Sequence, residues 1–411
     1  MTVSGALTDW GACAADLLDD LASLSVPGSG VTRLPFTPEH RAAADFLSAR
    51  MKRAGLEVWL DDAGTLVGRL EGPAGRGTLL MGSHQDSVRH GGACDGSMGV
   101  VRPLVELEKL RAEGREPPCS VEVLGFADEE GVRFPTALVG SRALAGTVDP
   151  GVLDMEDAEG MTLRTAMAGF GLSPERIVTL KRDPGDVIGF VETHIEQGPV
   201  LERAGEALGV VSAICGIERH SIGIVGETGH AGTLPMEGRK DALVAASAIV
   251  TEVNRLALET EGLRGTVGAM TIGPNVVNAV PRMARLTAEF RSPDDTVRAA
   301  AGEALHEFAE ALCERMDLGL SCGLTYQQPA QPCAAGLSDR LVKAVKAAGG
   351  QGLVLPSGAT HDASAMADLC PVAMLFVRCR GGVSHRPEEY AAPEDMGQAV
   401  AVLAELMMSV D

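Results

Sequence analysis

The segment TLLMGSHQDSVRHGGACDGSMGV, residues 78–100, is the part of the chain that says most about its fold. It opens with an apolar run typical of a buried strand and continues into a loop that holds His84, Asp86 and Asp95. Open α/β sheets bind their ligands just past the carboxyl ends of their strands. The segment therefore predicts a ligand-binding strand exit, although a polar loop with a helix-capping aspartate explains it equally well on its own.

Further apolar runs have the length and composition of central strands. A helix is predicted to begin at Thr37–Pro38, a capping hydroxyl followed by a proline, and to end near the glycine at position 55. Alternating strands and helices are the pattern of an α/β domain whose sheet is covered on both faces. The predicted central strands are residues 78–81, 121–126, 187–193 and 372–377.

Residues 209–327 show a different order of predicted strands and helices. Strands are predicted near 210–214, 220–225, 267–272, 285–291 and 318–325, and helices over 239–255 and 296–316. Such a set is enough for a separate α+β domain. We therefore expect residues 1–208 and 328–411 to form one discontinuous domain, into which residues 209–327 are inserted.

The composition limits the partners and the compartment. The 411 residues carry a formal charge of −21, which would repel nucleic acid and anionic membranes over most of the surface. Nine cysteines are scattered without a CxxC spacing, which is typical of reduced thiols, and the acidic N-terminal segment lacks the basic start of a signal peptide. We expect a cytoplasmic protein that binds neither nucleic acid nor membranes.

Three further strand exits carry residues of the kinds that bind metals. They are FADEEGVRF (126–134) with Glu129 and Glu130, FVETHIEQGPVLE (190–202) with His194, and GGVSHRPEEY (381–390) with His385. Taken singly, such residues are more often solvated charges or structural histidines. Together with His84 and Asp95 they suit two divalent ions that share one bridging carboxylate. The sequence thus predicts a dinuclear metal site.

Five ordered motifs add a family resemblance. They are GSHQDSVRHGGACDG (82–96), ADEEGVRF (127–134) followed by GSRALAG (140–146), HIEQGPVLE (194–202), GHAGTLPM (229–236) with RKDAL (239–243), and LPSGATHDA (355–363). The set resembles the N-carbamoyl-L-amino-acid hydrolases and allantoate amidohydrolases, within the dinuclear-metal aminoacylases and peptidases. The resemblance implies a catalytic domain with a central mixed sheet flanked by helices. It also implies an inserted lid or dimerisation domain with a four-stranded sheet and two helices.

The resemblance assigns a role to each residue of the predicted metal site. One ion would be held by His84, Asp95 and His194. The other would be held by Asp95, Glu130 and His385, so that Asp95 is the bridge. Histidine and carboxylate ligands accept zinc, manganese, cobalt or nickel. We expect two divalent metal ions per subunit.

Catalytic roles follow from the same resemblance. Glu129 would be the general base, and Asp86 would orient His84. His230, in the inserted domain, would polarise the scissile carbonyl. The peptide bond after Asp95 would be cis.

The resemblance also implies residues that bind the substrate. Asn278 would stabilise the oxyanion together with His230. Arg291 would clamp the substrate carboxylate, with a surface ion pair to Asp294 or Asp295 as the alternative. The pocket around the ureido group would be completed by Gln197, His361 and the backbone of Ser357, Gly358 and Ala359. The inserted domain would mediate a homodimer.

The predicted reaction is hydrolysis of the ureido C–N bond of an N-carbamoyl-L-amino acid, which yields the amino acid, ammonia and carbon dioxide. The substrate would be a small ureido or N-acyl amino acid with a free carboxylate. Allantoate, another ureido acid, is the nearest alternative, and an N-acyl-amino-acid hydrolase or dipeptidase is a more distant one. A non-catalytic binding protein would require a missing ligand or base, and none is missing from the motifs.

Overall fold

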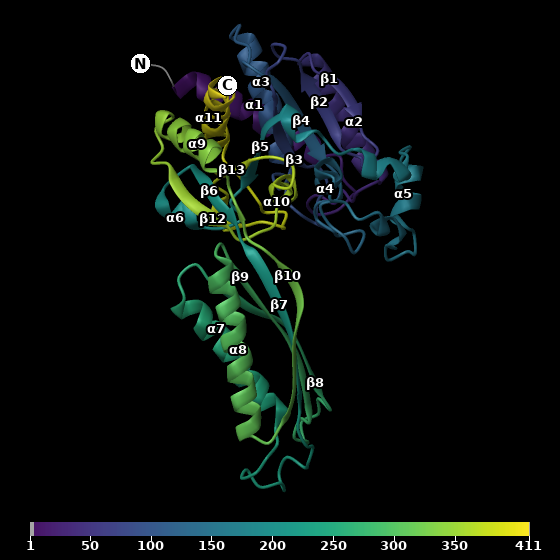
Figure 1. The fold of residues 1–411 in the computed structure, drawn as a ribbon, viewed down its shortest axis with the longest axis vertical. Coiled ribbons are helices and arrows are strands. Elements are labelled where there is room, and N and C mark those ends of the chain that lie inside the picture. Colours follow the sequence, from purple (N-terminus) through teal and green to yellow (C-terminus); the bar gives the residue numbers. More distant parts are fainter. Residues whose placement is uncertain (1–3, 411) are drawn as a thin grey trace. The chain divides into compact units, whose positions relative to one another are not determined.

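The computed structural model describes residues 4–410, and it divides into two compact units (Figure 1). The first comprises the chain up to Ser212, Cys333–Leu355, and the residues from Ala359 onward. The second comprises Ala213–Pro332 and Pro356–Gly358. The chain therefore enters the second unit after residue 212 and returns to the first after residue 332. The sequence pattern put these two boundaries after residues 208 and 327.

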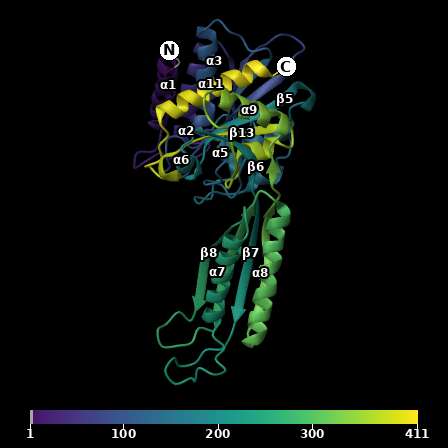
Figure 2. The same cartoon turned by 90° about the vertical axis from the view of Figure 1, so that its left-hand side faces the viewer.

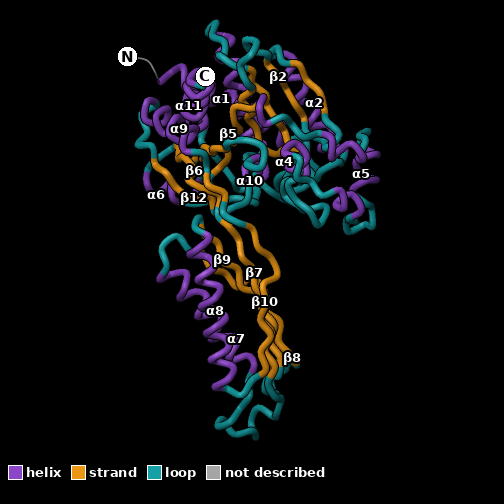
Figure 3. The backbone as a smooth tube through the Cα atoms, viewed as in Figure 1, coloured by secondary structure: helices purple, strands orange, loops and turns teal. Residues whose placement is uncertain are grey.

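The first unit is built on a mixed nine-stranded sheet; Figure 3 draws the strands of both units in orange. Its strands, in spatial order, are β1 (Glu57–Leu60), β2 (Leu66–Leu70), β4 (Ser120–Phe126), β3 (Thr78–His84), β5 (Val187–Ile195), β13 (Val372–Val377), β6 (Leu208–Ile214) and β11 (Gln331–Pro332), with β12 (Leu353–Ser357) also paired to β6. The four central strands, β4, β3, β5 and β13, run parallel to one another. All four predicted central strands are confirmed, and the mixed sheet agrees with the predicted fold class.

The strand predicted at residues 210–214 was assigned to the wrong domain. It is β6, which pairs antiparallel with β13 through the Leu375–Val210 and Val377–Leu208 partners and so belongs to the large sheet. The pairing explains why the first unit extends to Ser212. A strand's partners are set by tertiary packing, which a local sequence pattern does not reveal.

One face of the large sheet packs against a layer of helices, several of which lie side by side in Figure 2. These helices are α1 (Ser4–Ala22), α2 (Pro38–Arg53), α3 (Ser97–Ala112), α9 (Ala335–Ala347) and α11 (Pro393–Ser409). Helix α2 begins as predicted, with the Thr37 side chain accepting the His40 N–H. The residues of the four central strands that join this core are odd-numbered, such as Leu79, Val121 and Leu375. Because side chains alternate along a strand, the even-numbered residues face the opposite side of the sheet.

That opposite face carries the residues of the predicted site. His84 is the last residue of β3 and His194 the next to last of β5, both at even-numbered positions, and both are buried. The remaining helical segments of the first unit are α4 (Val139–Ala145), α5 (Leu163–Gly169), α6 (Val200–Ala204), α10 (Asp362–Met366), and the 3-10 turns Pro150–Asp154, Pro174–Thr179, Pro184–Asp186 and Arg380–Gly382. Helix α10 contacts both β5 and β13.

The second unit is a four-stranded antiparallel sheet packed against two helices. The strands, in spatial order, are β10 (Gly319–Gln328), β7 (Gly216–Val225), β9 (Met283–Ser292) and β8 (Arg264–Gly273), and the helices are α7 (Ala242–Glu259) and α8 (Asp295–Arg315). Asp241 and Asp294 cap these two helices by accepting backbone N–H groups of the first turn. The predicted α+β architecture of four strands and two helices is confirmed.

No helix between residues 4 and 410 is long and apolar enough to cross a membrane. All nine cysteines are free thiols.

Candidate metal centre

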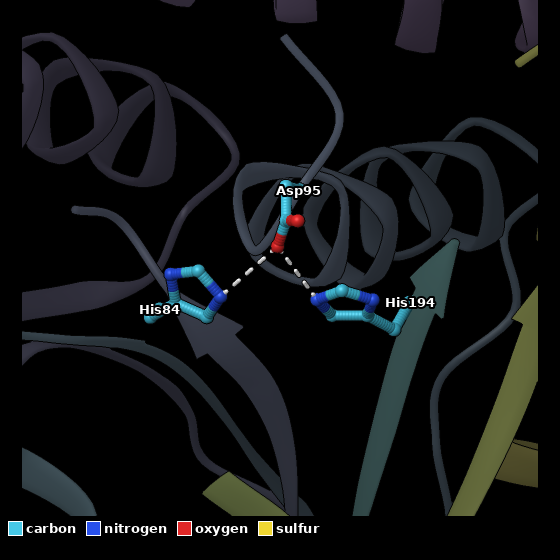
Figure 4. A group of neighbouring side chains, drawn as sticks. All are labelled: His84, Asp95 and His194. Carbon is cyan, nitrogen blue, oxygen red and sulfur yellow. Dashed lines mark ion pairs between the residues drawn. The ribbon is translucent and has the colours of Figure 1, made fainter. Parts of the chain in front are cut away.

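Asp95 lies at the centre of three histidines that come from distant parts of the chain. Its Oδ1 atom lies 3.4 Å from Nε2 of His84 and 3.0 Å from Nε2 of His194 (Figure 4). Its other oxygen, Oδ2, lies 3.3 Å from Nε2 of His385. One oxygen of the carboxylate therefore faces His84 and His194 and the other faces His385, as is expected of a ligand that bridges two ions.

Glu129 and Glu130 bring two more carboxylates to this group. Glu130 Oε2 lies 3.8 Å from Nε2 of His385, and Glu129 Oε2 lies 3.8 Å from Nε2 of His84. The possible ligand atoms fall into three groups of three, and within each group they lie within 4.8 Å of one another. The structure thus brings together all five predicted ligands and the predicted base.

The hydrogen bonds of the buried histidines fix which nitrogen faces Asp95. Nδ1 of His84 lies 2.9 Å from the backbone oxygen of Asp86, and Nδ1 of His194 lies 2.9 Å from that of Ile195. A carbonyl oxygen can only accept, so each Nδ1 donates and each neutral ring keeps its lone pair on Nε2. Both Nε2 atoms face an oxygen of Asp95, and Nε2 of His194 also accepts the Gly96 N–H at 3.3 Å, so a cation beside Asp95 would find two imidazole nitrogens in reach.

Without a metal ion, the carboxylates favour a proton on the histidines of the group, which shows that the cluster attracts positive charge. Burial opposes protonation of His84, but the charge of Glu129 and the hydrogen bond to Asp95 outweigh it and hold the pKa of His84 well above its usual range. The hydrogen bond to Asp95 is the main cause that raises the pKa of His385 to about 9. Burial raises the pKa of Glu130 to about 7.

The donor set therefore fits two divalent metal ions. Three imidazole nitrogens and two carboxylates are ligands that zinc, manganese, cobalt and nickel accept. Glu130 Oε1 is buried and makes no hydrogen bond to any described residue, so a buried acceptor is available for a cation. Such orphaned acceptors are costly unless a partner binds them.

Gly96 lets the loop of Asp95 pass close to His84. Its φ of 62° is open to glycine, and a Cβ atom there would lie 2.3 Å from Cε1 of the His84 ring. The prediction that the peptide bond after Asp95 is cis was wrong. Within residues 4–410 the cis peptide bond is Gly273–Pro274, and the chain reversal after Asp95 is made by the positive φ of Gly96 instead.

A family comparison adds to this geometry. The model of peptidase family M20/M25/M40 matches residues 80–409. The chain belongs to this family. It is 38% identical to the N-carbamoyl-L-amino acid amidohydrolase of Geobacillus stearothermophilus, over 92% of each protein. It is 35% identical to the allantoate deiminase of Arabidopsis thaliana, over 95% of this chain and 81% of that protein.

A solved structure gives the same assignment. The crystal structure of an amidase of the hydantoinase/carbamoylase family from Burkholderia multivorans superposes with a TM-score of 0.91, at 32% identity over 97% of each chain. The predicted family resemblance is therefore confirmed. This chain is an M20 hydrolase, an amidohydrolase of the hydantoinase/carbamoylase family.

In this M20 hydrolase, Asp86 supports the site differently from the prediction. The contact to Nδ1 of His84 is made by the Asp86 backbone oxygen, and the carboxylate oxygen is farther away, at 3.9 Å. The carboxylate instead accepts the backbone N–H groups of Glu129, at 3.2 Å, and Glu130, at 3.3 Å. Asp86 thus joins the two strand exits that carry His84 and the glutamate pair.

Gln197 and His361, two residues predicted to bind the substrate, lie beside the metal ligands. Gln197 donates from Nε2 to Oδ2 of Asp95, at 2.9 Å, and its Oε1 atom is buried without a hydrogen-bond partner among the described residues. The His361 ring packs edge-to-face against His194 with a centroid distance of 4.6 Å. Burial, and then the charge of His194, holds the pKa of His361 well below its usual range.

The other predicted substrate residues, apart from Ala359, belong to the second unit. His230 and Asn278 are exposed and lie on adjacent segments, joined by the Ala231 N–H and the Asn278 carbonyl at 2.9 Å. Arg291 donates to Glu289 and to the Gly358 carbonyl, each at 2.8 Å.

The predicted alternative partners of Arg291 have other contacts. Asp294 caps helix α8, and Asp295 pairs with Arg298. Ser357 uses its backbone oxygen to accept the Cys215 N–H at 2.9 Å.

Sequence reasoning missed the buried carboxylate of Glu192. It accepts the hydroxyl of Ser83 at 2.6 Å and the backbone N–H of Ala363 at 2.8 Å, and so ties β5 to β3 and to helix α10. The signal was present, because a glutamate inside the apolar strand VIGFVETHI, two residues before His194, must face the same side of the sheet as that histidine.

Proposed function

We propose that this M20 hydrolase cleaves the ureido C–N bond of N-carbamoyl-L-amino acids. Water would add to the ureido carbon, the amino acid would leave, and the remaining carbamic acid would break down to ammonia and carbon dioxide. The observation that carries the proposal is the cluster of three histidines and two glutamates around Asp95 and His84, in a chain 38% identical to an N-carbamoyl-L-amino acid amidohydrolase.

Two divalent ions per subunit would occupy the cluster. His84, Asp95 and His194 would hold one, and Asp95, Glu130 and His385 the other. When bound, such ions lower the pKa of a water toward neutrality and polarise a carbonyl group. The buried Oε1 of Glu130 and the Nε2 atoms of His84 and His194 that face Asp95 support this assignment.

Glu129 would move the proton. Its carboxylate is buried and lies near the cluster without belonging to either of the two proposed ligand sets. Burial, only partly offset by His84, holds the pKa of Glu129 well above its usual range, which suits a group that must accept a proton from water and then release it. Glu129 would take that proton at a carboxylate oxygen and deliver it to the leaving nitrogen.

Gln197 would bind the ureido group. Its Nε2 is engaged by Asp95, which leaves the buried Oε1 as an acceptor with no partner among the described residues. A ureido group supplies N–H donors, whereas an ester or a ketone does not. His361 and the backbone of Gly358 and Ala359 would complete this part of the pocket.

The second unit would supply the remaining substrate contacts. His230 and Asn278 would stabilise the oxyanion, and the backbone pairing of the two segments that carry them supports a joint role. Arg291 would bind the substrate carboxylate with its planar guanidinium. We also propose that this unit mediates a homodimer, which is supported by the exposed edge strand β8. The cytoplasmic location stays a prediction.

Allantoate is a second candidate substrate, because the allantoate deiminase of Arabidopsis thaliana matches 95% of this chain at 35% identity. Both substrates are ureido acids that the same residues could bind. An N-acyl amino acid is less well supported, since it offers fewer N–H donors to Gln197.

The test is a panel of N-carbamoyl-L-amino acids, allantoate and N-acetyl amino acids, assayed with Zn²⁺, Mn²⁺, Co²⁺ or Ni²⁺. The proposal expects the highest kcat/KM for an N-carbamoyl-L-amino acid. A higher value for allantoate would favour the second candidate. A metal-loaded protein that hydrolyses no ureido acid would contradict both and favour a binding function.

A further inference from the structure

Glu389 is a buried glutamate, 6% exposed, that lies four residues after the predicted ligand His385. Its Oε1 atom accepts two backbone N–H groups, those of Cys94 and Asp95, each at 2.9 Å. Asp95 and Glu389 are 294 positions apart in the sequence. The Glu389 side chain, from the loop before helix α11, therefore fixes the backbone of Asp95 at the centre of the metal site.

The second oxygen of Glu389 reaches the Asp95 side chain through a serine. The hydroxyl of Ser384 lies 3.1 Å from Oε2 of Glu389 and 2.9 Å from Oδ2 of Asp95. Gln197 Nε2 contacts both the same Asp95 oxygen and the Ser384 hydroxyl. Residues that are not proposed metal ligands thus hold both the backbone of Asp95, through Glu389, and its carboxylate, through Ser384 and Gln197.

Close packing supports this contact. A Cβ atom at Gly92 would lie 2.3 Å from Cβ of Glu389, so the loop that carries Asp95 comes close to Glu389 only because residue 92 is glycine. Ser384 and Glu389 flank His385, whose φ of 58° is unusual for a residue with a side chain. The same short loop therefore supplies one ligand directly and sets the position of another.

We propose that Glu389 is a positioning residue of the metal centre, which sets the orientation of Asp95 through two backbone hydrogen bonds and the Ser384 hydroxyl. The inference rests on the proposed metal pair. Glu389 would touch neither ion. Groups that orient a metal ligand in this way typically change metal affinity by about 10- to 100-fold when they are removed.

The experiment is calorimetric titration of chelator-treated protein with Mn²⁺. Glu389→Ala is expected to weaken Mn²⁺ binding by about 10- to 100-fold, because Asp95 loses its backbone anchor. Glu388→Ala is the matched control, since the neighbouring Glu388 side chain is 64% exposed and contacts only Arg386 among its described ion pairs. It should bind Mn²⁺ as the wild type does.

Glu389→Gln separates hydrogen bonding from charge. Its amide oxygen can still accept both N–H groups, and its amide nitrogen can donate to Ser384, so Mn²⁺ affinity should stay within about threefold of the wild type. A glutamine variant that binds as weakly as the alanine variant would overturn the proposal, because charge rather than position would then be responsible.

The remaining outcomes are also decisive. If the wild type binds Mn²⁺ and Glu389→Ala binds it equally well, the inference is wrong while the proposed metal site stands. If the wild type binds no Mn²⁺, the metal site itself is wrong and the inference falls with it. If Glu389→Ala does not fold, Ser384→Ala carries the test: weaker Mn²⁺ binding supports the positioning role, and unchanged binding overturns it.

Discussion

The carboxylate of Asp86 accepts the backbone N–H of Glu129 at 3.2 Å, which links the strand exit after β3 to the one after β4. The same carboxylate accepts the next N–H along the chain, that of Glu130, at 3.3 Å. Asp86 is therefore placed to position both glutamates, while its backbone oxygen sets the tautomer of His84.

Replacement of Asp86 by alanine tests this division of roles. We expect kcat at saturating Mn²⁺ to fall by about 10- to 100-fold, because the segment that carries Glu129 loses two hydrogen bonds. The backbone contact to His84 remains in the variant, so the site formed by His84, Asp95 and His194 should still bind metal. Steady-state kinetics and metal analysis check the two statements, and an unchanged kcat would contradict the first.

Glu129 and Glu130 should respond differently to the same change. Glu129→Gln removes the proposed base and is expected to lower kcat by about 10²- to 10⁴-fold with the metal retained. Glu130→Gln removes a proposed ligand and should weaken metal binding itself. Parallel measurements of kcat and of bound metal distinguish the variants. Undiminished hydrolysis by Glu129→Gln would exclude Glu129 as the base.

Substrate recognition by Arg291 predicts a change in KM. Arg291→Ala should raise KM for an N-carbamoyl-L-amino acid by about 10- to 100-fold, the effect of losing a hydrogen bond to a charged group. Arg285→Ala is the matched control, because Arg285 is exposed on the same strand, β9. Equal KM values for the two variants would argue against a carboxylate clamp at Arg291.

A buried pair outside the site predicts how stability changes with pH. Arg102 and Glu106 lie one turn apart in helix α3, both fully buried, and no side-chain N or O atom of this pair makes a hydrogen bond within the described chain. Burial raises the pKa of Glu106 from 4.5 to about 8. Between pH 4.5 and about pH 8, Glu106 therefore keeps its proton in the folded chain but has released it in the unfolded chain. The free energy of unfolding therefore falls as pH rises, by up to about 1.4 kcal/mol per pH unit.

Glu106→Gln removes this titration. The melting temperature of the variant, relative to the wild type, should therefore rise between pH 5 and pH 8. Glu405→Gln, at a side chain that is 60% exposed, serves as the control and should show no such trend. A constant difference between Glu106→Gln and the wild type across this pH range would refute the assignment.

Much of the site could be predicted from the sequence because each ligand obeys a local rule. His84 and His194 lie at the ends of apolar strands and Glu130 lies in the loop after one, and parallel neighbouring strands bring their carboxyl ends to one edge of the sheet. Each strand was recognisable by its apolar run. The convergence of the ligands then followed from the topology.

The contacts that were missed or misassigned join segments far apart in the chain. The pairing of β6 with β13, the Glu389 contact to Asp95 and the Gln197 contact to Asp95 depend on tertiary packing, which local patterns do not encode. The Asp86 carboxylate was assigned to the nearest histidine in the sequence, whereas its hydrogen bonds go to backbone groups on another strand exit. Polar side chains carry no periodicity that identifies their partners.

The central claim is that Asp95 joins two divalent ions held by side chains from four strand exits. Its most direct test is the metal content of the purified, Mn²⁺-loaded and dialysed protein, measured by mass spectrometry. We expect two ions per chain in the wild type and in Asp45→Ala, a control at an exposed position of helix α2, and fewer than one in Asp95→Ala. A wild type with no stoichiometric metal, or an Asp95→Ala variant that keeps both ions, would contradict the account.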